Sequence, residues 1–171
     1  MPRWTGGALP GNAVLAARLT GMADRSIATT PVMESMVVAF HEYENYKFEK
    51  EGPGWQELAS STIDVKNSLG YAGTNILERT GTLWDSLTGV GDYSTVTVSP
   101  LGWESISIVP YAGWHVQGVP EHNMPARPPV DLPGTPRGDA LIASWIELLQ
   151  RYVVGFGIQR ISAAEMQRIL S

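Results

Sequence analysis

Residues 30–52 read TPVMESMVVAFHEYENYKFEKEG and carry the most regular pattern in the chain. Thr30 is a suitable cap for a helix with Pro31 in its first turn, and the Gly-Pro-Gly run at 52–54 ends one. Between these signals, apolar side chains recur every three or four residues, the spacing of one helix face. The stretch therefore predicts a long helix that lays this stripe on a core or on a partner: Met33, Met36, Val37, Phe40 and Tyr43.

Helices are also predicted towards both ends of the chain. Asn12 is a suitable N-cap for a helix over 13–25, and Asp139 begins a second amphipathic run. A short last helix is expected from Ser162, because Glu165 follows three positions later and completes a capping box. The run after Asp139 places its apolar residues on one broad face: Leu141, Ile142, Trp145, Ile146, Leu149 and Tyr152.

The middle of the chain predicts short helices followed by a β-hairpin. Residues 55–89 have no long regular pattern, which favours short helices joined by loops. Residues 94–99 and 104–109 alternate polar and apolar side chains strictly, and Pro-Leu-Gly-Trp at 100–103 separates them. This alternation predicts two antiparallel strands with one buried and one solvent-exposed face.

Together these elements predict an α+β fold, in which a small antiparallel β-sheet packs with several α-helices. A chain of 171 residues has the length of one domain, so residues 1–171 are expected to form a single unit. The Gly/Pro-rich residues 1–11 are expected to be a flexible start, and about 138–171 a C-terminal helical part.

Composition excludes several classes of protein. The formal charge is −5 and no basic patch stands out, which argues against a dedicated nucleic-acid binder. Charged residues make up only 17%, a deficit that a covered surface such as a subunit interface would explain. Cysteine is absent, so disulfides and thiolate chemistry are excluded. Nowhere do ~18 apolar residues run together as a membrane span requires, and we expect a soluble protein.

Residues 111–128, YAGWHVQGVPEHNMPARP, combine histidines, aromatic residues and an arginine with glycine and proline. His115 and His122 lie seven apart with Glu121 and Asp131 nearby, but a third ligand at a recognisable spacing is missing, which favours hydrogen-bonded structure over a metal site. Nucleophile-elbow and phosphate-loop motifs are absent from the sequence. We therefore predict a structural corner here, and no catalytic, cofactor-binding or metal-binding residue in the chain.

Two alternatives of another class remain open. A hydrolase would use His115 and Asp131, and a module that binds cell-wall sugars would use Trp84, Trp103 and Trp114, although such tryptophans more often fill a core or an interface. The carboxylates of the long helix could also act as acid and base, but their charged surroundings favour a solvated face. They are Glu42, Glu44, Glu49 and Glu51.

Four short segments occur in an order that resembles a known family. They are Trp55-x-x-Leu58-x-x-x-Thr62-x-x-x-Lys66, then Ile76-Leu77-Glu78-Arg79-Thr80-Gly81-Thr82-Leu83-Trp84-Asp85-Ser86-Leu87, then Tyr111-Ala112-x-x-His115-x-x-Gly118, and Met124-Pro125-Ala126-Arg127-Pro128. With them the chain resembles the phage virion morphogenesis family, the tail-completion or neck proteins of tailed bacteriophages. Here Val116 separates His115 from Gln117, where family members often have His-Gln, and Pro129 replaces an aromatic residue that commonly follows the last segment.

The resemblance implies a ring-forming α+β structural protein of the virion, without catalytic activity or cofactor. Its place would be the neck or the head-proximal tail, after synthesis in the cytoplasm of the bacterial host, and a tail terminator is the nearest alternative. The implied partners are further copies of the chain, with six as the expected ring size, and neighbouring head-closure, tail-terminator or tail-tube proteins. Genomic DNA would only pass through the channel, and no membrane is involved.

Such a ring needs rigid contact surfaces between subunits. Prolines order the segment around Arg127 in advance, and its planar fork suits a carboxylate of the same chain or of a neighbour. We also expect an acidic channel lining that repels DNA, supplied by the acids at 41–44 and 48–51. The predicted interface residues are Tyr111, Trp114, His115, Arg127 and Pro128.

Overall fold

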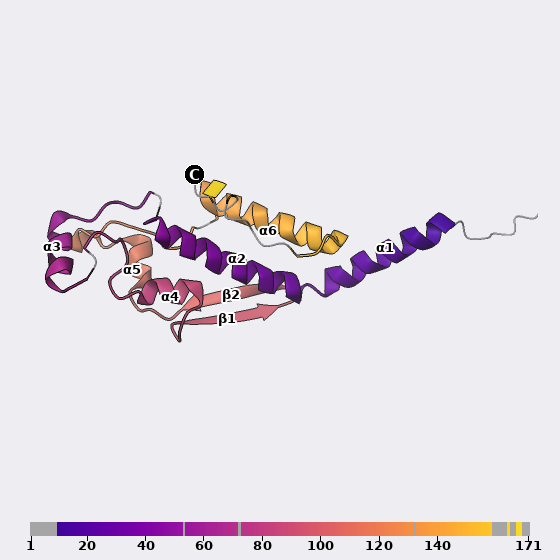
Figure 1. Cartoon of the computed structure of the whole chain (residues 1–171), viewed down its shortest axis with the longest axis horizontal. Coiled ribbons are helices and arrows are strands. Elements are labelled where there is room, and N and C mark those ends of the chain that lie inside the picture. The colour runs from indigo at the N-terminus through magenta and orange to yellow at the C-terminus, as the bar shows by residue number, and fades with distance from the viewer. Residues whose placement is uncertain are drawn as a thin grey trace, which may run out of the picture.

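The computed structural model describes residues 10–52, 54–71, 73–131 and 133–158, together with 164, 167 and 168. Within these residues it is a mixed α+β structure of six α-helices and one two-stranded antiparallel sheet packed against helices, so the predicted fold class is confirmed (Figure 1). Residues 1–9 of the expected flexible start, and most of the helix expected from Ser162, lie outside the described residues.

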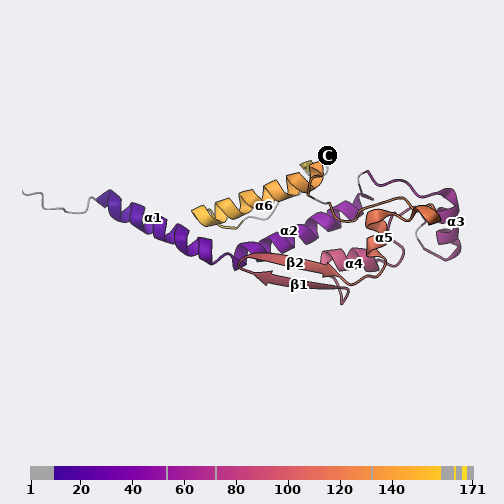
Figure 2. The same cartoon turned by 180° about the vertical axis from the view of Figure 1, so that it is seen from behind.

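Helix α2 (Thr30–Glu49) forms the centre of the molecule, with α6 (Pro136–Val154) on one side and the hairpin on the other (Figures 1 and 2). Its predicted stripe is confirmed, because Met36, Val37, Phe40 and Tyr43 are all buried and Met33 packs against a buried cluster. Neighbours on two sides explain why α2 buries more than a single stripe. Its buried residues are Val32, Met36, Val37, Ala39, Phe40, Tyr43, Glu44, Lys47 and Phe48.

Helix α6 packs on α2 with a narrower face than the sequence predicts. Leu141 and Leu148 are buried, against Tyr43 and against the Val32 end of α2 respectively, whereas Ile146 of the predicted face is 49% exposed. Ile146 lies away from the buried positions because only the side of α6 that faces α2 is covered. The helix also begins earlier than Asp139, since the hydroxyl of Thr135 caps it by accepting from the N–H of Gly138 at 3.1 Å.

Helix α1 (Pro10–Ile27) begins two residues before the predicted cap at Asn12 and projects from the end of the molecule (Figure 1). Side-chain hydrogen bonds fasten the C-terminal end of α1 to the body. There the Nε of Arg25 donates to the carbonyl oxygen of Val153 at 2.9 Å. Just beyond the helix, the hydroxyl of Tyr152 donates to the carbonyl oxygen of Ala28 at 2.6 Å.

The hairpin consists of β1 (Ser94–Ser99) and β2 (Gly102–Ser107), so the second strand begins two residues before the predicted one. In the register that pairs Ser99 with Gly102, Val98 lies opposite Trp103 and Thr95 opposite Ile106. Val96 and Val98 therefore share one face of the sheet, while Ile106 lies on the other and is 48% exposed. The prediction of one covered and one solvent-exposed face is confirmed, but the alternations of the two strands are out of phase in this register, so the isoleucines of the second strand lie on the exposed face.

The short helices predicted over 55–89 are confirmed as α3 (Ser60–Ser68) and α4 (Thr82–Thr88). The stretch 111–128 also contains α5 (Ala112–Gln117) and the 3-10 turn Pro120–His122. Side chains from α2, α4 and the segment after the hairpin build a core beneath these elements. Its buried members are Phe48, Leu83, Leu87 and Val109, packed with Trp55, Leu77, Trp84, Tyr111, Ala112 and Val130.

Candidate functional site

The predicted interface residues meet at one corner of the fold, which we call the α5 corner and define as residues 55–57, 111–118 and 124–130. The rings of Tyr111 and His115 are perpendicular with centroids 6.0 Å apart, and the N–H of Arg127 donates to the carbonyl of His115 at 2.7 Å. The indole N–H of Trp55 donates to the carbonyl of Pro128 at 3.1 Å. Trp114 points outward and is 61% exposed, which makes it the one large exposed apolar side chain of the corner.

Arg127 fastens the corner from inside. Its side chain is buried, and the guanidinium donates from Nε to the carbonyl of Gln56 at 2.7 Å and from Nη2 to that of Glu57 at 3.0 Å. The carboxylate partner expected from the sequence is therefore replaced by two carbonyl oxygens of the same chain. This fork ties the segment after α2 to the proline-rich segment, and any part that Arg127 plays at an interface is through the shape of the corner.

Gly118 allows the chain to turn back tightly after α5. Its φ is 73°, in the left-handed region, and a Cβ at this position would lie 2.7 Å from the backbone nitrogen of Ala126 and 2.9 Å from the carbonyl oxygen of Met124. Both obstacles are backbone atoms, which cannot move aside as a flexible side chain can. A glycine is required here for two independent reasons.

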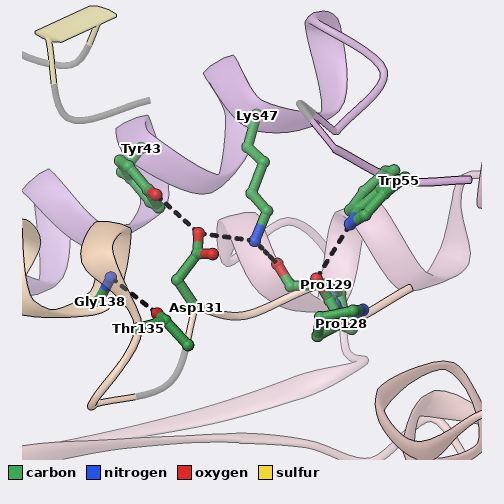
Figure 3. Close-up of polar contacts among 8 residues, drawn as sticks. All are labelled: Tyr43, Lys47, Trp55, Pro128, Pro129, Asp131, Thr135 and Gly138. Carbon is green, nitrogen blue, oxygen red and sulfur yellow. Dashed lines mark hydrogen bonds and ion pairs between the residues drawn. The ribbon is translucent and has the colours of Figure 1, made fainter. Parts of the chain in front are cut away.

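A buried ion pair lies beside the corner, between α2 and the proline-rich segment (Figure 3). The Nζ of Lys47 lies 2.9 Å from Oδ2 of Asp131 and donates to the carbonyl of Pro129 at 2.7 Å. The hydroxyl of Tyr43 donates to the same Oδ2 at 2.7 Å. Burial and the contact with Asp131 raise the pKa of Tyr43, so its hydroxyl keeps its proton and remains a donor. The three side chains fix the path of the segment after Pro128.

Glu44 is the least expected group in this region. Its side chain is fully buried, and neither carboxylate oxygen has a hydrogen-bond partner among the described residues. Burial raises the pKa of Glu44 to about 8, an effect that Lys47 opposes and Asp131 reinforces. The prediction that Glu44 belongs to a solvated acidic face, or to the lining of a channel, is therefore wrong, because the packing of α2 on two sides encloses it.

Lys66, one of the residues that carry the family resemblance, clamps the turn before α4. Its buried Nζ donates to the carbonyls of Asn75 at 2.5 Å and Glu78 at 2.9 Å, on the two sides of Leu77. Leu77 has a φ of 59°, a conformation unfavourable for a bulky residue, and its side chain packs into the core beneath the α5 corner. The lysine thus holds a strained turn in place, and burial lowers its pKa.

The structure separates the two residues of the hydrolase alternative. His115 contacts Tyr111 and Arg127, and its buried Nδ1 has no hydrogen-bond partner among the residues that the structure describes. Burial, followed by the charge of Arg127, lowers the pKa of His115. Oδ2 of Asp131 is engaged by Lys47 and Tyr43 instead. A carboxylate that orients a catalytic histidine would contact one of its ring nitrogens, and this pair makes no such contact.

The described residues offer few features of another kind of site. Groups of three or more His, Cys, Asp or Glu placed to hold a metal ion are absent there, and the same part of the chain contains no helix with the length and apolar character to cross a membrane. Trp84 and Trp103 are largely packed inside, which leaves Trp114 to the sugar-binding alternative. A shallow hollow elsewhere on α2 is lined by His41, Glu42, Asn45, Tyr46, Glu49, Thr88 and Val90.

Comparison of the chain with family models, with curated proteins and with solved structures finds no match in any of the three. The family resemblance therefore stays a prediction from the four segments.

Proposed function

We propose that this chain is a structural protein of a tailed-bacteriophage virion, located at the head–tail junction, where it joins or stabilises the head and the tail. It works there as a ring of copies between head-closure proteins and tail-terminator or tail-tube proteins, and DNA passes through the ring. A tail terminator, which stops growth of the tail tube, is the alternative within the same class.

The observation that carries this proposal is that the four segments resembling the family pack into one unit. Trp55 of the first, Leu83 of the second and Tyr111 of the third share a core. Trp55 bonds to Pro128 of the fourth, and Arg127 of the fourth bonds to Gln56 and Glu57 beside Trp55. Segments spread over more than 70 positions therefore have a common structural purpose, as expected for the framework of a family.

A second observation favours assembly over catalysis. Trp55 and Arg127 of the α5 corner and Lys47 of the neighbouring ion pair donate to carbonyl oxygens and so fix the backbone, and Trp114 is presented on the outside. Exposed aromatic residues on a rigid framework are characteristic of protein–protein contacts, because they bury a large area at a small entropic cost.

The test is electron microscopy of a lysate from the phage that encodes the chain, with an early stop codon in this gene and wild type alongside. DNA-filled heads beside separate tails of normal length would support a joining or completion role. Tails of uncontrolled length would support the terminator instead. Intact infectious particles from the stop-codon phage would refute the virion role, and a plasmid carrying the wild-type gene must restore any defect.

A further inference from the structure

The N-terminal half of α1 is left uncovered by the part of the chain that the structure describes. Every residue from 13 to 20 is exposed, although six of the eight are apolar. Val14, Leu15 and Leu19 are each 56% or 57% exposed, and helical spacing places them with Arg18 on one side of the helix. Such a short helical stretch is marginal in water without tertiary packing, so this apolar side calls for a partner.

The attachment of α1 prevents the helix from covering its own body. Only Ala28 and Thr29 separate α1 from α2, and the Thr29 hydroxyl donates to the carbonyl of Pro100 at the hairpin turn. The bonds from Arg25 to Val153 and from Tyr152 to Ala28 hold the other side of the junction. In both cartoon views α1 points away from α2 and from the hairpin (Figures 1 and 2).

The same chain has a second uncovered surface, the outer face of the hairpin, which we define by Thr95, Thr97, Glu104, Ile106 and Ile108 and which carries two exposed isoleucines. Ile106 is 48% and Ile108 58% exposed, and the opposite face carries Trp103, which packs against α2 and α6. All the defining residues are exposed, so none of the described elements covers this face. A helix laid across a two-stranded sheet is an ordinary layer arrangement in α+β proteins.

The charges of the two surfaces are opposite. Residues 1–27 contain three arginines and one aspartate, a formal charge of +2, whereas residues 28–171 account for −7. The stretch from 80 to 126, which includes the hairpin, contains four acids and neither lysine nor arginine. Arg18 lies among the apolar residues of α1, and Glu104 lies beside Ile106 on the outer face.

We propose that α1 docks through Val14, Leu15, Arg18 and Leu19 onto the outer face of the hairpin of a second copy of this chain. The contact joins two different surfaces, so each copy offers a helix to one neighbour and a hairpin to the next. Repetition of such a contact closes into a ring or grows into a filament. This contact specifies how copies would join in the proposed ring. It rests on the proposed function, because both require that the chain associates with itself.

The decisive test exchanges charges in the full-length chain. Arg18→Glu and Glu104→Arg are each expected to raise the dissociation constant of self-association about tenfold, because each brings like charges together at the contact. In the double variant the pair is restored with reversed signs, and the constant should return to within about threefold of wild type. Both residues are exposed, so neither change threatens the fold. Sedimentation velocity measures the constants, and unchanged values in both single variants would overturn the proposal.

Cross-linking identifies the surfaces directly, since the chain has no cysteine of its own. Mixing Ala17→Cys with Thr97→Cys and adding a short bismaleimide should give a heterodimer, whereas Ser61→Cys on α3, at the far end of the molecule, should not react with either (Figure 1). Dimers of Ala17→Cys alone would mean that the helices pair with each other and would overturn the proposal. Self-association without the heterodimer would sink this contact and leave the proposed ring standing, while a monomer at every concentration would count against both.

Discussion

Replacing Glu44 by glutamine should stabilise the protein at neutral pH and flatten its dependence on pH. Burial raises the pKa of Glu44 from 4.5 to about 8, with Lys47 and Asp131 as the charged groups that act on it. Between these two pH values the native protein holds a proton that the unfolded chain has released. The free energy of unfolding must therefore fall as the pH rises through this window.

The size of the effect follows from the width of the window. At ~1.4 kcal/mol for each pH unit, the rise from 4.5 to about 8 corresponds to a loss of ~5 kcal/mol across the whole window and ~3 kcal/mol by pH 7. Lys47 lies one helical turn away and already moderates the shift. Glu44→Gln keeps the shape of the side chain and removes the titration, so it should recover most of the loss at pH 7.

Urea denaturation at pH 5, 6, 7 and 8 measures this difference, with wild type, Glu44→Gln and Glu34→Gln in parallel. Glu34 lies on the same helix but is exposed, so its replacement should leave the slope against pH unchanged. Equal slopes for wild type and Glu44→Gln would refute the reasoning, because they would mean that Glu44 titrates near its ordinary value in the folded protein.

Three further changes test the framework around the α5 corner. Lys47→Met should cost ~3 kcal/mol of unfolding free energy, because it leaves the largely enclosed carboxylate of Asp131 with the hydrogen bond from Tyr43 but without its cation, and the double variant Lys47→Met/Asp131→Leu should cost less than the single one. Gly118→Ala should lower the free energy of unfolding by more than ~1 kcal/mol, because of its positive φ and the backbone atoms that a Cβ would meet. Gly113→Ala in α5, where a Cβ meets nothing within 4 Å, should be neutral or stabilising by up to ~1 kcal/mol. Thermal denaturation compares the two variants. Trp114→Ala should leave the unfolding free energy within ~0.5 kcal/mol of wild type and yet fail to restore plaques when supplied to the stop-codon phage.

Periodicity was sufficient to predict the elements that carry their own pattern. The stripe of α2 and the existence of the hairpin follow from local spacing, and local spacing survives folding. The phase of the hairpin does not follow, because the turn takes only Pro100 and Leu101 and thereby sets which residues of the two strands face each other. The sequence pattern predicts a separation of four residues, 100–103, between the strands, whereas the structure has a turn of two. The choice between these two turn lengths depends on how the strands lie on α2.

The partners of the polar groups in the site were harder to predict from the sequence than the helices and strands. Glu44 lies one turn from Phe40 and one from Phe48, so its spacing hinted at burial, but acids beside it in the sequence indicated solvent instead. Arg127 was expected to meet a carboxylate, and its partners are carbonyl oxygens about 70 positions away. Backbone acceptors carry no mark in the sequence, since every residue has one. Contacts of this kind become visible only when the fold is known.

Stability and assembly depend on different sides of the hairpin, and this separation makes the proposed contact testable. A two-stranded sheet is marginal by itself, so the hairpin must draw its stability from its inner face. There the ring centroid of Trp103 lies 5.2 Å from that of Phe40 in α2 and 5.4 Å from that of Trp145 in α6. Trp103 thereby links β2 to both helices. Ile106, on the outer face, has no such neighbours and remains half exposed. Loss of the Trp103 side chain should therefore unfold the hairpin, whereas a polar residue at Ile106 should leave the fold intact and weaken only the contact between copies.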